Sequence, residues 1–95
     1  MTFGERVREL RENQNMLLRH LASQLDIDTS IISKIERGDR QFRKEMIPRL
    51  ADILKADKLE LETLWLADQV MNLIKDEPTA NEALKTVRNN IKGLN

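Results

Sequence analysis

Apolar side chains recur every three or four residues along most of this chain, and this spacing constrains the fold more than any other feature. Near the C-terminus the apolar positions are Ala80, Leu84, Val87, Ile91 and Leu94, at intervals of four, three, four and three. Such intervals place side chains on one face of an α-helix, whereas a half-buried strand alternates apolar and polar residues. No stretch alternates in that way, so the sequence predicts an all-α fold.

Residues typical of helix ends divide the pattern into six predicted helices. Thr2 and Glu5 have the spacing of a capping box at the start of the first helix. Gly38 favours a left-handed end to the third helix, and Asp28 is placed to cap its start. The predicted helices cover about residues 3–12, 18–25, 29–37, 47–54, 58–75 and 79–92.

Three further helix boundaries lie in the second half of the chain. Pro48 is tolerated in the fourth helix because it lies in the first turn. Asp57 and Glu60 repeat the spacing of a capping box at the start of the fifth helix. Pro78 breaks that helix before the sixth begins.

Composition excludes several classes of function. The 95 residues allow one domain. There is no cysteine, and His20 is the only histidine, so thiolate chemistry and sites with two imidazoles are excluded. No nucleophile with a base, paired carboxylates or phosphate loop is visible, and we expect no enzyme, cofactor or metal. No apolar run reaches the roughly 18 residues of a membrane span, and the first residues lack the apolar stretch of a signal peptide. We therefore expect a soluble, cytoplasmic protein with no membrane partner.

Basic residues cluster in the first half of a chain whose net charge is zero. Residues 1–44 carry nine Lys or Arg against seven Asp or Glu, and residues 45–95 carry seven against nine. Within eleven residues lie Lys34, Arg37, Arg40, Arg43 and Lys44. A local basic patch attracts a polyanion even where the whole-chain charge is balanced.

The second and third predicted helices have the spacing of a helix-turn-helix unit. On the third helix Ile32 and Ile35 are expected to face the core. The outward positions carry short hydroxyls and one lysine, which can reach base edges in the major groove. A merely solvated surface would favour Glu, Lys or Arg instead. The residues predicted to contact bases are Thr29, Ser30, Ser33 and Lys34.

The stretch LASQLDIDTSIISKIERG, residues 21–38, closely resembles the Xre-type helix-turn-helix regulators, the group of the lambda-type repressors and Cro proteins. Leu50, Ala51 and Leu54 also stand where that family has them, and the resemblance covers about residues 3–66. It implies a compact five-helix, lambda-repressor-like domain, followed here by an additional C-terminal helix. The implied function is a sequence-specific transcriptional regulator, in the form of a dimeric bacterial or phage-type repressor that binds a palindromic operator in double-stranded DNA.

The resemblance also implies roles for individual residues. Its base-contacting positions correspond to the four outward residues of the third helix. In the family a glutamate at the position of Glu36 pairs with an arginine of the first helix, which corresponds to Arg11 here. This pair would be structural rather than catalytic. The second helix departs from the family, because Leu17 and Leu18 replace a Ser-Gln pair that caps the helix and contacts phosphate. Arg19 is the nearest replacement.

The loop after the third helix is predicted to contact DNA phosphates. Phosphate contacts provide affinity and register but do not read sequence. Together with Arg19, the predicted phosphate-contacting residues are Arg40, Gln41, Arg43 and Lys44.

The C-terminal third is too apolar for one buried face. Apolar residues cover about half of the circumference of the fifth helix, which implies a second buried surface. We assign residues 1–66 to the helix-turn-helix domain and residues 57–95 to helices for homodimerisation, continuous with it in one compact body. An alternative is that these helices cover the core or bind another protein, as in an interaction module or an antitoxin. The predicted dimerisation residues are Leu64, Trp65, Val70, Met71, Ile74, Leu84, Val87 and Ile91.

Overall fold

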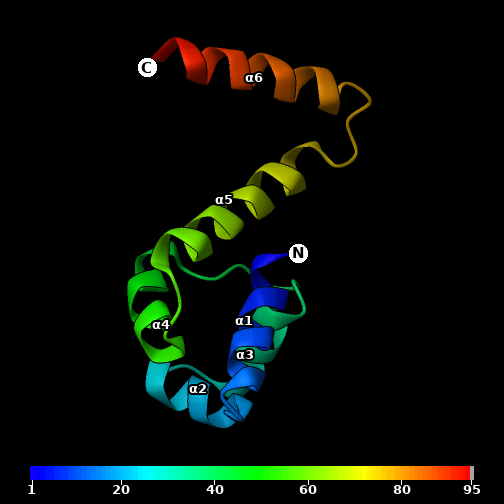
Figure 1. Cartoon of the computed structure of the whole chain (residues 1–95). Coiled ribbons are helices and arrows are strands. Elements are labelled where there is room, and N and C mark those ends of the chain that lie inside the picture. The colour runs from blue at the N-terminus through cyan, green and yellow to red at the C-terminus, as the bar shows by residue number, and fades with distance from the viewer. Residues whose placement is uncertain (95) are drawn as a thin grey trace.

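The computed structural model describes residues 1–94, and in this range it is entirely helical (Figure 1). No strand occurs among these residues, which confirms the all-α prediction. The described elements are α1 (Phe3–Asn13), α2 (Leu18–Leu25), α3 (Thr29–Glu36), the short 3-10 helix η1 (Lys44–Met46), α4 (Ile47–Leu54), α5 (Lys58–Ile74) and α6 (Ala80–Leu94).

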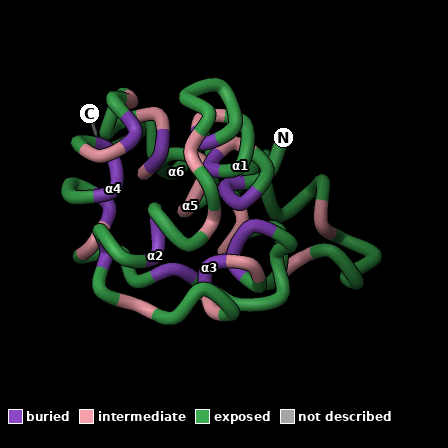
Figure 2. Tube along the Cα trace, turned by 90° about the horizontal axis from the view of Figure 1, so that it is seen from below, coloured by how far each residue is buried: buried purple, intermediate pink, exposed green. Residues whose placement is uncertain are grey.

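The core lies between α1, α2, α3, α4 and the start of α5. Figure 2 shows buried positions along α1 to α4, whereas most of the chain outside them is exposed. Leu61 is the only residue of α5 that is fully buried, and α6 has none among its described residues. The buried apolar side chains are Phe3, Val7, Leu21, Ala22, Leu25, Ile32, Ile35, Phe42, Ile47, Leu50, Ala51, Leu54 and Leu61.

Local hydrogen bonds confirm two of the predicted helix ends. The Thr2 hydroxyl accepts from the Glu5 N–H at 3.1 Å, and the Glu5 carboxylate accepts from the Thr2 N–H at 2.8 Å, which completes the capping box. Gly38 has φ +80°, and the N–H groups of Gly38 and Asp39 donate to the carbonyls of Ile35 and Lys34. This is the Schellman arrangement that a left-handed glycine allows.

Two predicted caps are wrong in part. Asp28 occupies the N-cap position of α3, but its side chain makes no capping hydrogen bond. The Asp57 carboxylate does cap α5, accepting from the Leu59 N–H at 3.0 Å. Glu60 does not complete a capping box there, because its carboxylate binds the Arg6 Nε atom of α1 at 2.5 Å. A long-range ion pair has replaced the local bond.

α1 approaches the end of α3 closely at Gly4. A Cβ atom on Gly4 would lie 2.3 Å from the Ile35 carbonyl oxygen and 2.6 Å from that of Glu36. Because these neighbours are backbone atoms, they cannot rotate away as a flexible side chain would. Glycine at this position therefore sets the distance between the two helices.

α6 lies apart from the core. α5 extends beyond the core, the chain turns at residues 75–79, and α6 then runs separately at the opposite end of the molecule from α2 (Figure 1). The radius of gyration is 15.2 Å, against about 12 Å for a compact domain of this length. The helices α1 to α4 and the start of α5 thus pack into one body, and α6 lies outside it (Figure 1).

Candidate nucleic-acid interface

α2 and α3 meet through a tight turn of three residues, Asp26 to Asp28. Asp26 is left-handed, with φ +58°, a conformation that aspartate tolerates better than most residues. The Ile27 N–H donates to the Ala22 carbonyl at 3.0 Å, and the Ile27 side chain packs against the core. The turn thus ends α2 and fixes the direction in which α3 leaves it.

α3 has one buried face and one accessible face. Ile32 and Ile35 are buried, as predicted, which leaves Thr29, Ser30 and Lys34 exposed. Thr29 and Ser30 present short hydroxyls and Lys34 a longer cation, and groups of both kinds can hydrogen-bond to base edges. The accessible face is therefore held in place by packing on the opposite side of the helix.

Ser33 is less available than the other three predicted base-contacting residues. It is half-buried, and its hydroxyl accepts a hydrogen bond from the Arg37 Nη1 atom at 2.8 Å. The Arg37 Nε atom also lies 3.2 Å from the Asp39 carboxylate. Ser33 and Arg37 line the same surface hollow as Arg8 of α1 and Leu18 of α2.

Arg37 is a candidate DNA-contacting residue to which the sequence analysis gave no role. Its side chain is exposed next to α3. In the sequence it stands out only as one member of the basic cluster. The spacing does contain a signal, since Arg37 follows Ser33 by four positions and Lys34 by three. Residues at these intervals are neighbours on a helix surface.

A buried ion pair joins α1 to α3. The Arg11 Nε and Nη2 atoms donate to the two Glu36 carboxylate oxygens at 2.8 and 3.0 Å, and Arg11 Nη1 donates to the Met16 carbonyl at 2.7 Å. Both side chains are at most 10% exposed. The hydrogen bonds that Arg11 donates to the Glu36 carboxylate raise the pKa of Arg11 above its ordinary value. The structure therefore contains the pair that the resemblance implied. Through its bond to the Met16 carbonyl, Arg11 also ties the α1–α2 loop to α3.

The first turn of α2 lacks a side-chain cap. Leu17 occupies the N-cap position without a capping hydrogen bond, as expected from its side chain. Leu18 packs partly against the core, and Arg19 is exposed. A cation is therefore present on the surface at the start of α2.

The family profile described as a helix-turn-helix domain matches residues 2–64, which are 63 of the 95 residues. This chain belongs to the helix-turn-helix domain family. The match supports a DNA-binding regulator and covers all elements from α1 to the first half of α5. Comparisons with curated proteins and with solved structures found no match.

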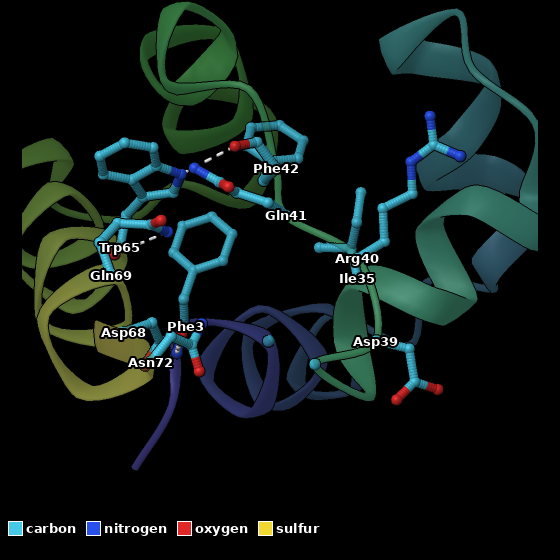
Figure 3. A pocket seen from close by; sticks show the side chains of 12 residues that line it. Phe3, Ile35, Asp39, Arg40, Gln41, Phe42, Trp65, Asp68, Gln69 and Asn72 are labelled. Atoms are coloured by element: carbon cyan, nitrogen blue, oxygen red, sulfur yellow. Dashed lines mark hydrogen bonds between the residues drawn. The ribbon is translucent and has the colours of Figure 1, made fainter. Parts of the chain in front are cut away.

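The basic loop of this helix-turn-helix domain divides into two parts. Arg40, Gln41 and Arg43 are exposed, and the Arg40 side chain extends away from Trp65 (Figure 3). Lys44 instead lies over the Trp65 ring, with its Nζ atom 5.9 Å from the ring centroid. The structure thus holds the end of the loop against α5.

Trp65 anchors the loop to the domain. Its indole N–H donates to the Phe42 carbonyl at 2.7 Å, and the Phe42 ring packs on Phe3, with centroids 5.6 Å apart (Figure 3). The Asp68 carboxylate of α5 accepts from the Phe3 N–H at 3.0 Å. These contacts surround a cavity of about 210 Å³ between α5, the start of α1 and the loop.

Two of the predicted dimerisation residues have a role inside the domain. Leu64 and Trp65 are half-buried against the core of their own chain. Both side chains therefore contribute to packing within their own chain, whereas Val70 and Met71, further along α5, are exposed.

Residues 1–94 contain neither a clustered metal site nor a membrane-spanning helix. No group of three His, Cys, Asp or Glu side chains is placed to hold a metal ion among them. In the same range, no helix is both long and apolar enough to cross a membrane.

Proposed function

We propose that this chain is a dimeric transcriptional repressor that reads a palindromic DNA operator. The observation that carries the proposal is the accessible face of α3, where Thr29, Ser30 and Lys34 are exposed on a helix held by the Arg11–Glu36 pair. Hydroxyls can donate to or accept from base edges in the major groove, and lysine can donate to them. Ser33 is a secondary candidate, because Arg37 already engages its hydroxyl.

The cations around α3 support contacts with the DNA backbone. Such contacts fix the register of the protein on the duplex. Arg37 joins the predicted set on the strength of its exposed position beside α3. The proposed phosphate-contacting residues are Arg19, Arg37, Arg40, Gln41, Arg43 and Lys44.

The apolar surface of α5 and α6 supports the proposed dimer. Val70, Met71, Leu84, Val87 and Ile91 are all exposed in the single chain. Ile74 is half-buried and completes the proposed interface. A two-fold dimer presents two copies of α3 to half-sites about 34 Å apart on the DNA.

Selection of bound sequences from random double-stranded DNA tests this proposal. We expect a palindromic consensus whose half-sites are separated by one helical turn. A consensus with a single half-site would contradict the dimer, and the absence of any enriched sequence would contradict sequence-specific binding.

A second candidate is an interaction module or antitoxin whose C-terminal helices bind another protein. The exposed apolar residues of α5 and α6 favour it as well. The triple variant Thr29→Ala, Ser30→Ala, Lys34→Ala separates the two functions. Loss of regulation supports DNA reading by α3, whereas full retention of activity favours the interaction module.

A further inference from the structure

The exposed apolar side chains are concentrated on two helices. In residues 1–94, eleven large hydrophobic residues are exposed, and only Met1 and Leu17 lie outside α5 and α6. The remaining nine are Leu59, Leu66, Val70, Met71, Leu73, Leu84, Val87, Ile91 and Leu94. Soluble chains rarely expose so many neighbouring apolar groups unless a partner covers them.

The two helices do not cover each other within one chain. From the turn at residues 75–79 they diverge as the two arms of a V (Figure 1). α6 is absent from the pairs of helices that pack extensively in the structure. Leu84 and Val87 lie on one face of α6 because they are three positions apart, and Leu66 and Val70 share a face of α5 because they are four apart.

The two arms carry opposite charge. Residues 58–79 contain five carboxylates and two lysines, for a net charge of −3. Residues 80–94 contain three cations and one carboxylate, for a net charge of +2. The cations Lys85, Arg88 and Lys92 follow each other at three and four positions, alongside the apolar face of α6.

The charges at the turn and on α6 are also available for a partner. Among residues 1–94, neither Asp76 nor Glu77 forms a side-chain ion pair, and neither does Arg88 or Lys92. The acidic group therefore lies at the end of α5, and the basic group lies along α6 of the same chain.

We propose that two copies of this chain exchange α6, so that α6 of each copy lies along the second half of α5 of the other. The exchange places Leu84 and Val87 against Leu66 and Val70 of the second copy, and it brings the basic side of α6 towards the acidic turn. A two-fold axis satisfies both contacts at once, because each chain carries both complementary surfaces. The inference rests on the proposed dimer and specifies which helices form it.

Disulfide trapping between separately prepared variants tests the exchange, since the chain has no cysteine of its own. Val70→Cys and Val87→Cys each replace an exposed side chain. Val70 lies in the middle of the second half of α5, and Val87 lies in the middle of α6. When the two variants are mixed under reducing conditions and then oxidised, we expect several times more covalent dimer than either variant forms alone. Asn89→Cys, on the opposite face of α6, replaces Val87→Cys in the control and should give little product.

Sedimentation of the wild-type chain separates failure of the exchange from failure of the dimer. A dimer that gives no Val70–Val87 product in the mixture, or mainly the product of Val87→Cys alone, overturns the exchange and leaves the dimer standing. A monomer at all accessible concentrations overturns both. A disulfide within one chain of the Val70→Cys, Val87→Cys double variant also overturns the exchange, because α6 would then fold onto its own α5.

Discussion

The outer face of α3 combines two short hydroxyl side chains with one longer cation. Thr29 and Ser30 lie in the first turn of α3, and Lys34 lies about one turn later. Two hydroxyls keep the helix close to the base edges, and lysine reaches further to guanine O6 or N7.

Replacing Thr29, Ser30 or Lys34 singly by alanine should weaken binding to the selected operator by about 1–3 kcal/mol. Binding to random DNA should change less, because the lost contacts are to bases. Titrations of both DNAs by fluorescence anisotropy check this. Equal losses on the two DNAs would show that these side chains contact the backbone instead.

The buried Glu36 carboxylate is paired with the Arg11 guanidinium, which donates to both of its oxygens. Arg11→Met should destabilise the fold by about 3 kcal/mol, because it leaves the Glu36 carboxylate buried without a partner. The double variant Arg11→Met, Glu36→Leu should recover much of that loss. Urea denaturation of both single variants and the double variant gives the coupling free energy. Additive effects would contradict direct pairing.

Pairs of elements, more than single helices, set the position of the DNA-binding face. α1 meets α3 at Gly4, and α5 holds the basic loop through Trp65. Both contacts join segments that lie more than twenty residues apart. A change at either contact therefore shifts a whole element.

Gly4→Ala should destabilise the protein by about 1–3 kcal/mol, because its methyl group would overlap the carbonyl oxygens at the end of α3. Gly93→Ala is the matched control. Its Cβ meets no atom within 4 Å, and alanine favours a helix interior. Thermal unfolding should therefore show a loss for the first variant and no loss for the second. Equal effects would mean that α1 can shift away from α3 without cost.

The basic loop should contribute through charge. Arg40→Ala and Arg43→Ala should weaken binding to all DNA sequences alike, and each should reduce the slope of log affinity against log salt by about one. Lys75→Ala, at the turn after α5, removes the same charge far along the chain and should leave the slope unchanged. Unchanged slopes for both arginine variants would place the phosphate contacts elsewhere.

At the scale of the whole molecule, a compact DNA-binding body carries two projecting helices. The family match ends at residue 64, close to where the buried part of α5 ends. The proposed DNA-reading helix α3 lies in the compact body, and the proposed dimer surface lies on the second half of α5 and on α6, away from that body (Figure 1). Under this proposal α5 connects the two regions.

Met71→Glu should weaken the dimer without unfolding the chain. Met71 is 58% exposed in the single chain, so a carboxylate there disrupts only a surface that a partner covers. Affinity for a full palindrome should fall towards that for a half-site. Sedimentation and DNA titration measure the two effects, with Asn89→Glu on the opposite face of α6 as the control. Loss of the folded state in Met71→Glu would instead assign this residue to the core.

The sequence by itself determined the local structure of this protein. The helices follow from apolar spacing, and the Thr2–Glu5 capping box and the left-handed Gly38 were predicted where they occur. These features depend on residues only a few positions apart, so the chain specifies them before any packing occurs. The exposed face of α3 was predictable for the same reason, because it lies opposite two buried isoleucines. The Arg11–Glu36 pair came only from resemblance to a family.

Tertiary structure alone decided which distant groups meet. Glu60 could have closed its own capping box, but α1 brings Arg6 to it across 54 positions. In the sequence, Trp65 is one more apolar residue of the fifth helix. Only the packing of α5 against the loop brings its indole N–H to the carbonyl of Phe42. The direction of α6 depends on the backbone conformation of the turn at residues 75–79. The spacing of apolar residues does not specify that conformation. Such contacts depend on how whole helices pack, and spacing along one helix contains no information about its distant neighbours.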